Sequence, residues 1–179
     1  MIIALTGLHC AGKSYFLDNI PEKNGFKVIK KNELIEEICA YNGIENWHKW
    51  YQEEFTKSPY GTTKKIIDCL PEGDVVLDSV HSNLEWEIIK SIREDAILAL
   101  IVSPDYEREL RWNSQYKLTD KDNLRIHYWH NESAESQCLL SQVSIAFNGN
   151  LPIEYNNFLF KELVKIIKKE KNKVKILKK

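Results

Sequence analysis

The stretch that decides the fold is residues 1–16, MIIALTGLHCAGKSYF. An apolar run, Ile2–Thr6, leads into residues 7–14, which match the pattern G-x-x-x-x-G-K-[ST]. The two glycines let the backbone take angles that other residues avoid and let it approach a ligand closely. Successive N–H groups, together with the N-terminus of the helix that follows, then form a concave anion site. The stretch therefore predicts a loop that holds the phosphates of a nucleoside triphosphate.

Each residue of this phosphate loop (residues 7–14) has an expected role. The ammonium of Lys13 would reach the β- and γ-phosphates, and the hydroxyl of Ser14 would bind Mg²⁺. His9 and Cys10 occupy variable positions of the pattern, and we interpret them as spacers whose side chains leave the phosphates alone. The residues expected to bind the nucleotide are Gly7, Ala11, Gly12, Lys13, Ser14 and Tyr15.

Short apolar runs alternate with helix-compatible segments along the rest of the chain. The runs suit strands that are buried on both faces, as in a parallel sheet covered by helices. The alternation predicts a layered α/β domain. The predicted strands are Ile2–Thr6, Phe26–Ile29, Val75–Asp78, Ile97–Val102 and Val143–Phe147. The predicted helices are Lys13–Asn19, Asn32–Tyr41, Thr62–Leu70, Asn83–Ile92, Asp105–Asn113, Asp120–Glu132 and Tyr155–Lys169.

Charge is spread unevenly over a chain of 179 residues whose net charge is −1. Residues 161–179 hold nine Lys and two Glu, a balance of +7, so the remainder carries −8. Such a tail can touch phosphates or a membrane surface. The alternative, which we favour, is a solvated helix face.

The four cysteines are far apart in the sequence, which suits reduced thiols and excludes a disulfide framework or a zinc site. The first apolar run is too short for a signal peptide, and no run reaches the ~20 apolar residues of a membrane span. We therefore expect a single cytoplasmic domain. The cysteines are Cys10, Cys39, Cys69 and Cys138.

An acidic residue ends the third predicted strand, in residues 74–89, DVVLDSVHSNLEWEII. In proteins with a phosphate loop, an acidic residue there holds Mg²⁺ directly or through water, which gives Asp78 a metal-binding role. The alternative is that Asp78 caps the helix that follows. Ser79 and His81 come next, at the edge of the sheet where such folds bind ligands, so His81 is a further candidate.

Two arginines follow the fourth predicted strand. Phosphoryl transfer places negative charge on three oxygens, and the planar guanidinium group stabilises such charge well. Arg108 and Arg111 lie on one predicted helix, and the polar segment 113–123 beyond it suits a mobile lid that excludes water. The alternative, weighed equally, is a solvated helix hairpin with pairs such as Glu107 with Arg111.

Four segments together resemble the small P-loop kinases of the nucleoside-monophosphate kinase group, and most closely dephospho-CoA kinase and its relatives. LTGLHCAGKS resembles their phosphate loop, and VVLDSVHSNLEWE resembles the strand and turn that bring an acidic residue to the site. LIVSPDYERELRW resembles the fourth strand and the start of the lid helix, with Arg111 at the position of the lid arginine. IAFNGNLPIEYNNFLFKELVKII resembles the last strand, the Asn/Gly turn beside the adenine, and the final helix.

The resemblance implies a three-layer αβα P-loop kinase fold, with a five-stranded parallel sheet, helices on both faces and a helical lid. Residues 1–179 would form one domain, with an acceptor-side helical region at about 32–70, a lid at about 105–135 and the basic tail at 161–179. It also implies ATP with Mg²⁺, and adenine contacts from Asn148 and Gly149. The expected catalytic residues are Lys13, Asp78, Arg108 and Arg111, and the expected metal ligands are Ser14 and Asp78.

The acceptor side departs from the pattern of that group. Such kinases often carry Asp or Arg near the end of the second strand, where this chain has Lys30 and Lys31. Aromatic residues of the segment NWHKWYQEEF could stack on a ring, or could simply belong to the core. Lys64 and Lys65 are further candidates for an acceptor phosphate. The aromatic residues are Trp47, Trp50 and Tyr51.

The sequence thus predicts a Mg²⁺- and ATP-dependent kinase whose acceptor is a small molecule, and a nucleotide or a nucleotide-like cofactor precursor in particular. The alternative is a nucleotide-binding sensor or regulatory module with little kinase activity, which the residues after the second strand favour. An NTPase that acts on nucleic acid through the basic tail ranks last, because no platform rich in arginine and aromatic residues is visible.

Overall fold

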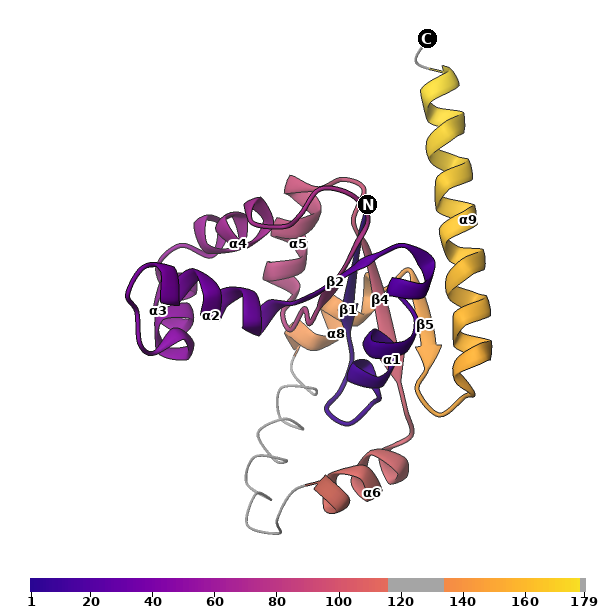
Figure 1. Cartoon of the computed structure of the whole chain (residues 1–179), viewed down its shortest axis with the longest axis horizontal. Helices are drawn as coiled ribbons and strands as arrows, with labels where there is room; N and C mark the ends of the chain where they lie inside the picture. The colour runs from indigo at the N-terminus through magenta and orange to yellow at the C-terminus, as the bar shows by residue number, and fades with distance from the viewer. Residues whose placement is uncertain (116–133, 178–179) are drawn as a thin grey trace.

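The computed structural model describes residues 1–115 and 134–177. Five parallel strands form one sheet in the order β2-β3-β1-β4-β5, with helices around it (Figure 1). This confirms the predicted three-layer α/β fold. The strands are β1 (Ile2–Thr6), β2 (Lys27–Lys30), β3 (Val75–Asp78), β4 (Ile97–Val102) and β5 (Ile145–Asn148). The helices are α1 (Lys13–Asn19), η1 (Glu22–Asn24), α2 (Lys31–Tyr41), α3 (Trp47–Lys57), α4 (Pro59–Asp68), α5 (Asn83–Ile92), α6 (Asp105–Gln115), α8 (Ala134–Ser141) and α9 (Ile153–Leu177).

The two edge strands differ from their predicted bounds. Phe26 is not part of β2: its N–H donates to the carbonyl of Pro21, and its ring packs into the core at 3% exposure. At the other edge, the N–H of Val143 closes the turn after α8, so β5 begins at Ile145. In both cases the backbone N–H of an apolar residue donates within a local turn, although the apolar pattern assigns that residue to a strand.

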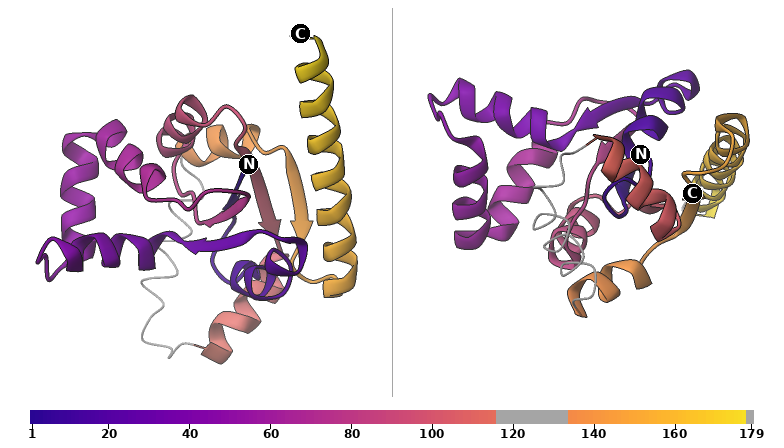
Figure 2. Two further views of the ribbon diagram at one scale, coloured as in Figure 1. Left: turned by 45° about the horizontal axis from the view of Figure 1, so that its top comes forward. Right: turned by 90° about the horizontal axis from the view of Figure 1, so that it is seen from below.

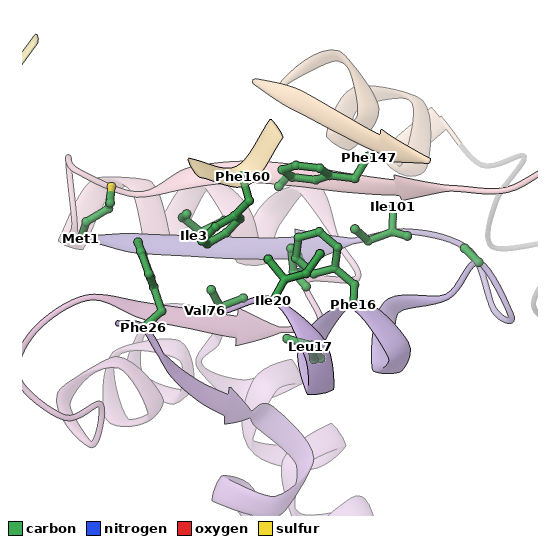
Figure 3. Packing of buried hydrophobic residues seen from close by; sticks show 13 residues of the cluster. Met1, Ile3, Phe16, Leu17, Ile20, Phe26, Val76, Ile101, Phe147 and Phe160 are labelled. Carbon is green, nitrogen blue, oxygen red and sulfur yellow. The ribbon is translucent and has the colours of Figure 1, made fainter. Parts of the chain in front are cut away.

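Aromatic residues fill the core on one face of the sheet. Phe16 of α1 and Phe160 of α9 pack with Phe147 of β5 and with Phe26, their ring centroids 4.8–6.3 Å apart (Figure 3). Each of these rings is at most 3% exposed. Because aromatic pairs of this kind contribute ~1 kcal/mol beyond area burial, this cluster anchors α1, and hence the phosphate loop, to the sheet.

The other face is covered by α5 and α8, with Trp86, Ile89 and Leu139 against the sheet. Beyond it, α2, α3 and α4 form an arm that projects to one side of the sheet (Figure 1). We call residues 31–68 the acceptor arm, after the acceptor-side role predicted for the region at about 32–70. Helices α3 and α8 were not predicted. Asn46 caps α3 and Ser58 caps α4, each accepting a backbone N–H with its side chain.

The order of the strands fixes where a ligand can bind. From β1 the chain crosses to β2 on one side, and from β3 it crosses over β1 to β4 on the other. Open α/β sheets bind ligands at such a switch point, outside the carboxyl ends of the strands. In this fold that crevice lies between the phosphate loop after β1 and the turn after β3.

Helix α9 runs along one side of the sheet and extends well past its end (Figure 2). Within the described residues, no helix has both the length and the apolar character that a membrane crossing requires. The predicted helix Asp120–Glu132 and most of the predicted lid lie outside the described residues.

Candidate nucleotide and acceptor sites

The backbone of the phosphate loop takes the angles that its glycines allow. Gly7 has φ 147° and Gly12 has φ 99°, and Cys10 also has a positive φ of 59°. A Cβ on Gly7 would lie 2.4 Å from the carbonyl oxygen of Ile101 in the neighbouring strand β4. Gly7 is therefore required for its φ, as the pattern predicted, and also for its close approach to β4, which the pattern did not predict.

Lys13 is the first residue of α1, and its side chain folds back into the loop. Its Nζ donates to the carbonyl oxygens of Gly7, at 2.7 Å, and of Leu8, at 3.0 Å. Burial lowers the pKa of Lys13, and the charge of Asp78 opposes that shift. The ammonium is thus held within the loop by neutral acceptors, which are weaker partners than phosphate oxygens.

Helix α6 docks directly on the phosphate loop. Arg111 Nη1 donates to the carbonyl oxygen of Cys10 at 2.9 Å, and Arg108 Nη1 donates to that of His9 at 3.4 Å. The ring of His9 also meets the ring of Trp112 edge-on, with centroids 4.9 Å apart. The interpretation of His9 as a mere spacer was therefore incomplete, because its ring and its carbonyl both hold α6.

Three cations consequently surround the loop at Cys10. Burial raises the pKa of the Cys10 thiol, while the charges of Arg111, Lys13 and Arg108 oppose that rise. Positive charge gathered at one loop favours a polyanionic ligand. The structure thus brings together Lys13, Arg108 and Arg111, as the sequence predicted.

Arg111 also ties the loop to the turn after β5. Its Nη2 donates to Asn150 Oδ1 at 2.7 Å and to the carbonyl oxygen of Gly149 at 3.4 Å. The guanidinium of Arg111 therefore contacts the turn after β5 instead of forming the predicted pair with Glu107. Neither Ser103, which accepts from Nη1 at 3.4 Å, nor Asn150 was predicted as a partner. No sequence signal marks them, because they lie 8 and 39 residues from Arg111.

Gly149 lies hard against the phosphate loop. A Cβ at Gly149 would sit 1.9 Å from the carbonyl oxygen of Ala11, and the N–H of Gly149 donates to the carbonyl of Val102 at 2.7 Å. The neighbouring Asn148 accepts through its side chain from the N–H of Asn150. The turn after β5 therefore borders the nucleotide side of the crevice, where adenine contacts were predicted.

Asp78 ends β3 beside the phosphate loop, because β3 pairs with β1 and Leu77 lies opposite Ala4. Its Oδ1 accepts from the hydroxyl of Ser79 at 2.9 Å. The capping alternative is wrong for Asp78, since Ser82 caps α5 by accepting from the N–H of Glu85. The metal-binding role of Asp78 therefore stays a prediction.

The predicted metal ligands are oxygen atoms, as Mg²⁺ prefers, but the protein supplies few of them. Mg²⁺ prefers oxygen ligands and takes one or two carboxylates with phosphates and water, which Ser14, Asp78 and a nucleotide would supply. Over residues 1–115 and 134–177, no three His, Cys, Asp or Glu gather into a metal site. A metal held there would depend on the nucleotide for part of its ligand set.

Tyr15, which was expected to bind the nucleotide, is 58% exposed on α1.

On the acceptor arm, the aromatic residues of α3 belong to a core. Trp47, Trp50 and Tyr51 pack against a cluster of Ile35, Cys39 and Ile66, which favours the core interpretation over ring stacking. Of the two predicted acceptor lysines, Lys64 forms an ion pair with Asp68 of its own helix, and Lys65 lies over the ring of Trp50.

A buried ion pair behind the turn after β3 was missed by the sequence analysis. Lys31 Nζ donates to Glu85 Oε1 at 2.8 Å and to Oε2 at 3.1 Å, and both side chains are 4% exposed. One signal was present, because Ser82 and Glu85 have the spacing of a helix capping box. That motif predicts a local role for Glu85 and says nothing of Lys31.

Comparison with known proteins places the fold. No model of a protein family matches the sequence, and no curated protein matches it. Similar solved structures include shikimate kinase from Aquifex aeolicus, with 18% identity, coverage of 95% of this chain and 98% of that one, and a TM-score of 0.52. A gluconokinase from Sinorhizobium meliloti has 14% identity, coverage of 96% and 95%, and a TM-score of 0.58. YorR from Bacillus subtilis, in complex with phosphorylated GDP, has 13% identity, coverage of 93% and 96%, and a TM-score of 0.59.

These likenesses are at low sequence identity, so they concern the fold. The chain shares its fold with solved P-loop small-molecule kinases, which confirms the fold that the sequence resemblance implied. The finer resemblance, to dephospho-CoA kinase or adenylate kinase, stays a prediction.

Proposed function

We propose that this protein is a Mg²⁺-dependent kinase that transfers the γ-phosphoryl group of ATP to a small-molecule acceptor. The observation that carries the proposal is the convergence of Lys13, Arg108 and Arg111 on the carbonyl groups of the phosphate loop, beside the end of β3 that carries Asp78. Phosphoryl transfer requires mainly that the protein position its reactants and stabilise charge on the equatorial oxygens. These groups suit that task.

Each side chain has a role in this proposal. Lys13 would exchange the carbonyls of Gly7 and Leu8 for phosphate oxygens, and Arg111 and Arg108 would approach the transferred group from α6. Mg²⁺, when bound near Ser14 and Asp78, supplies positive charge to the phosphates. As in the sequence analysis, the acceptor class we put first is a nucleotide or a nucleotide-like cofactor precursor.

A nucleotide-binding sensor with little transferase activity is the second candidate. The specific observation in its favour is that Lys31, which follows the second strand, is engaged by Glu85 and buried. No charge of Lys31 is therefore left for an acceptor. A sensor needs the phosphate loop and α6 but not an acceptor site.

Acceptor-dependent ADP formation separates the two candidates. The purified chain would be given Mg-ATP and a panel of acceptors: nucleoside monophosphates, dephospho-CoA, gluconate and shikimate. A kinase releases ADP much faster with one member of the panel than with ATP alone. A sensor binds ATP in a thermal-shift assay, yet its ADP release stays at the background rate with every acceptor.

A further inference from the structure

We propose that Glu85 is the positioning residue of the acceptor side, holding the turn after β3 and the acceptor arm in one fixed arrangement. This inference rests on the proposed function, because it concerns where the acceptor is presented to the phosphate loop. It starts from the two oxygens of a carboxylate that is 3% exposed.

The carboxylate of Glu85 joins three separate segments. Oε1 accepts from Lys31 Nζ at 2.8 Å and from the hydroxyl of Tyr51 at 3.5 Å. Oε2 accepts from the same Nζ at 3.1 Å and from the backbone N–H of His81 at 3.3 Å. The first residue of α2, the middle of α3 and the turn after β3 therefore meet at one side chain. We call this cluster of Glu85, Lys31, Tyr51 and His81 the hub.

The place of this hub in the sheet ties it to the candidate site. Lys30, the last residue of β2, lies opposite Asp78, the last residue of β3. Lys31 is thus one residue beyond the end of β2, which lies opposite the end of β3, and His81 is three residues beyond Asp78 on the segment that follows β3. Glu85 lies behind this turn and fixes its distance from the arm.

The electrostatics of the hub require that it form as a unit. An unpaired charge at 4% exposure is strongly unfavourable, so Lys31 and Glu85 each depend on the other. Burial, followed by the charge of Glu85, raises the pKa of Tyr51, so its hydroxyl stays protonated and able to donate. Lys31 Nζ also lies 5.7 Å from the centre of the Tyr51 ring.

A purely structural ion pair and a positioning residue differ in one measurable way. Replacing both charges, as in Lys31→Met with Glu85→Leu, removes the buried charges together and is expected to return the unfolding midpoint close to that of the wild type. It does not restore the carboxylate contact to the N–H of His81. We therefore expect kcat/KM for the best acceptor of the panel to fall roughly 10–100-fold, with less than a twofold change in the Kd for ADP.

Glu85→Asp provides a second variant that keeps the charge and shortens the reach by one methylene group. It is expected to lower kcat/KM for the same acceptor while leaving ADP binding unchanged, and Tyr51→Phe, which removes only the 3.5 Å contact, is the mild control. A double variant or Glu85→Asp protein with the full acceptor-dependent rate would overturn the proposal.

The failure of the proposed function looks different from the failure of this inference. If wild type gives no acceptor-dependent turnover, the kinase proposal fails, and the hub is then judged by amide hydrogen exchange. Glu85→Asp should speed exchange at residues 79–82 and at the start of α2 together, and should spare the phosphate loop. Unchanged exchange in either segment would contradict the hub.

Discussion

The proposed nucleotide side and the proposed acceptor side of this molecule handle positive charge in opposite ways. Around the phosphate loop, Lys13 and Arg111 donate to neutral backbone carbonyls, and within the described residues neither belongs to an ion pair. On the acceptor side, Lys31 is neutralised by Glu85 in a buried ion pair. A cation on a carbonyl can exchange it for a phosphate, whereas a buried ion pair cannot open without leaving a charge unpaired. The first side is therefore built to bind charge, and the second to hold its shape.

The largest expected effect breaks the nucleotide side alone. Lys13→Ala removes the ammonium that would meet the β- and γ-phosphates, so acceptor-dependent ADP formation should fall by more than about 10³-fold, or ~4 kcal/mol. The fold should survive, because Lys13 makes only hydrogen bonds within its own loop. Circular dichroism and the unfolding midpoint check the fold. Full activity in this variant would refute the kinase proposal.

The next effect breaks the acceptor side through stability. Lys31→Met leaves Glu85 buried without its cation and should lower the free energy of unfolding by roughly 3–4 kcal/mol in urea titrations. The matched control is Lys64→Met, which breaks the exposed pair with Asp68. Exposed pairs contribute less than ~1 kcal/mol, so the control should stay within that range. Equal losses in the two variants would contradict the contrast between the sides.

A smaller effect tests the contact between Gly149 and the phosphate loop. Gly149→Ala forces a methyl group against the carbonyl of Ala11 and should cost roughly 2–3 kcal/mol of stability. It should also weaken ADP binding, because the phosphate loop must shift. Gly43→Ala is the control: its φ is 69° with no neighbour within 4 Å of the added Cβ, so only about 1 kcal/mol of backbone strain is expected. ADP affinity that changes equally in both variants would argue against the contact.

The smallest effect concerns pH. Burial lowers the pKa of Lys13 against the opposing charge of Asp78, so this ammonium loses its proton at a lower pH than an ordinary lysine. ATP affinity, measured calorimetrically, should therefore begin to fall as pH rises and before it reaches 10.5, the ordinary lysine value. Lys13→Arg keeps its charge and should show a flat profile over the same range. A wild-type profile that is equally flat would place Lys13 outside the binding site.

The proposed nucleotide side could be predicted from the sequence because its residues lie close together in the chain. Gly7, Gly12 and Lys13 lie within seven residues, and the backbone that they shape is itself the binding element. Arg108 and Arg111 were also predicted, as residues three apart on a helix after a strand. What they hold in this structure, the carbonyls of the phosphate loop, depends on how α6 docks, and no local pattern encodes that.

The acceptor side could not be read in the same way. Lys31, Tyr51 and Glu85 come from three helices, and the contacts of Glu85 span 34 and 54 residues of chain. Each residue has an ordinary local explanation: a helix start, a core aromatic residue and a capping-box glutamate. Edge-strand bounds were wrong for a related reason, since a turn at Pro21 competes for the backbone of Phe26.

The layered α/β fold and the glycine-shaped loop follow from the amino-acid sequence alone, because strand burial and such a turn are local consequences of residue type and spacing. Three features emerge only from the packing of distant segments: Lys31 is neutralised, α6 rests on His9 and Cys10, and Gly149 touches Ala11. The physical reason is that charge pairing and close backbone approach depend on distances in space between residues far apart in the chain.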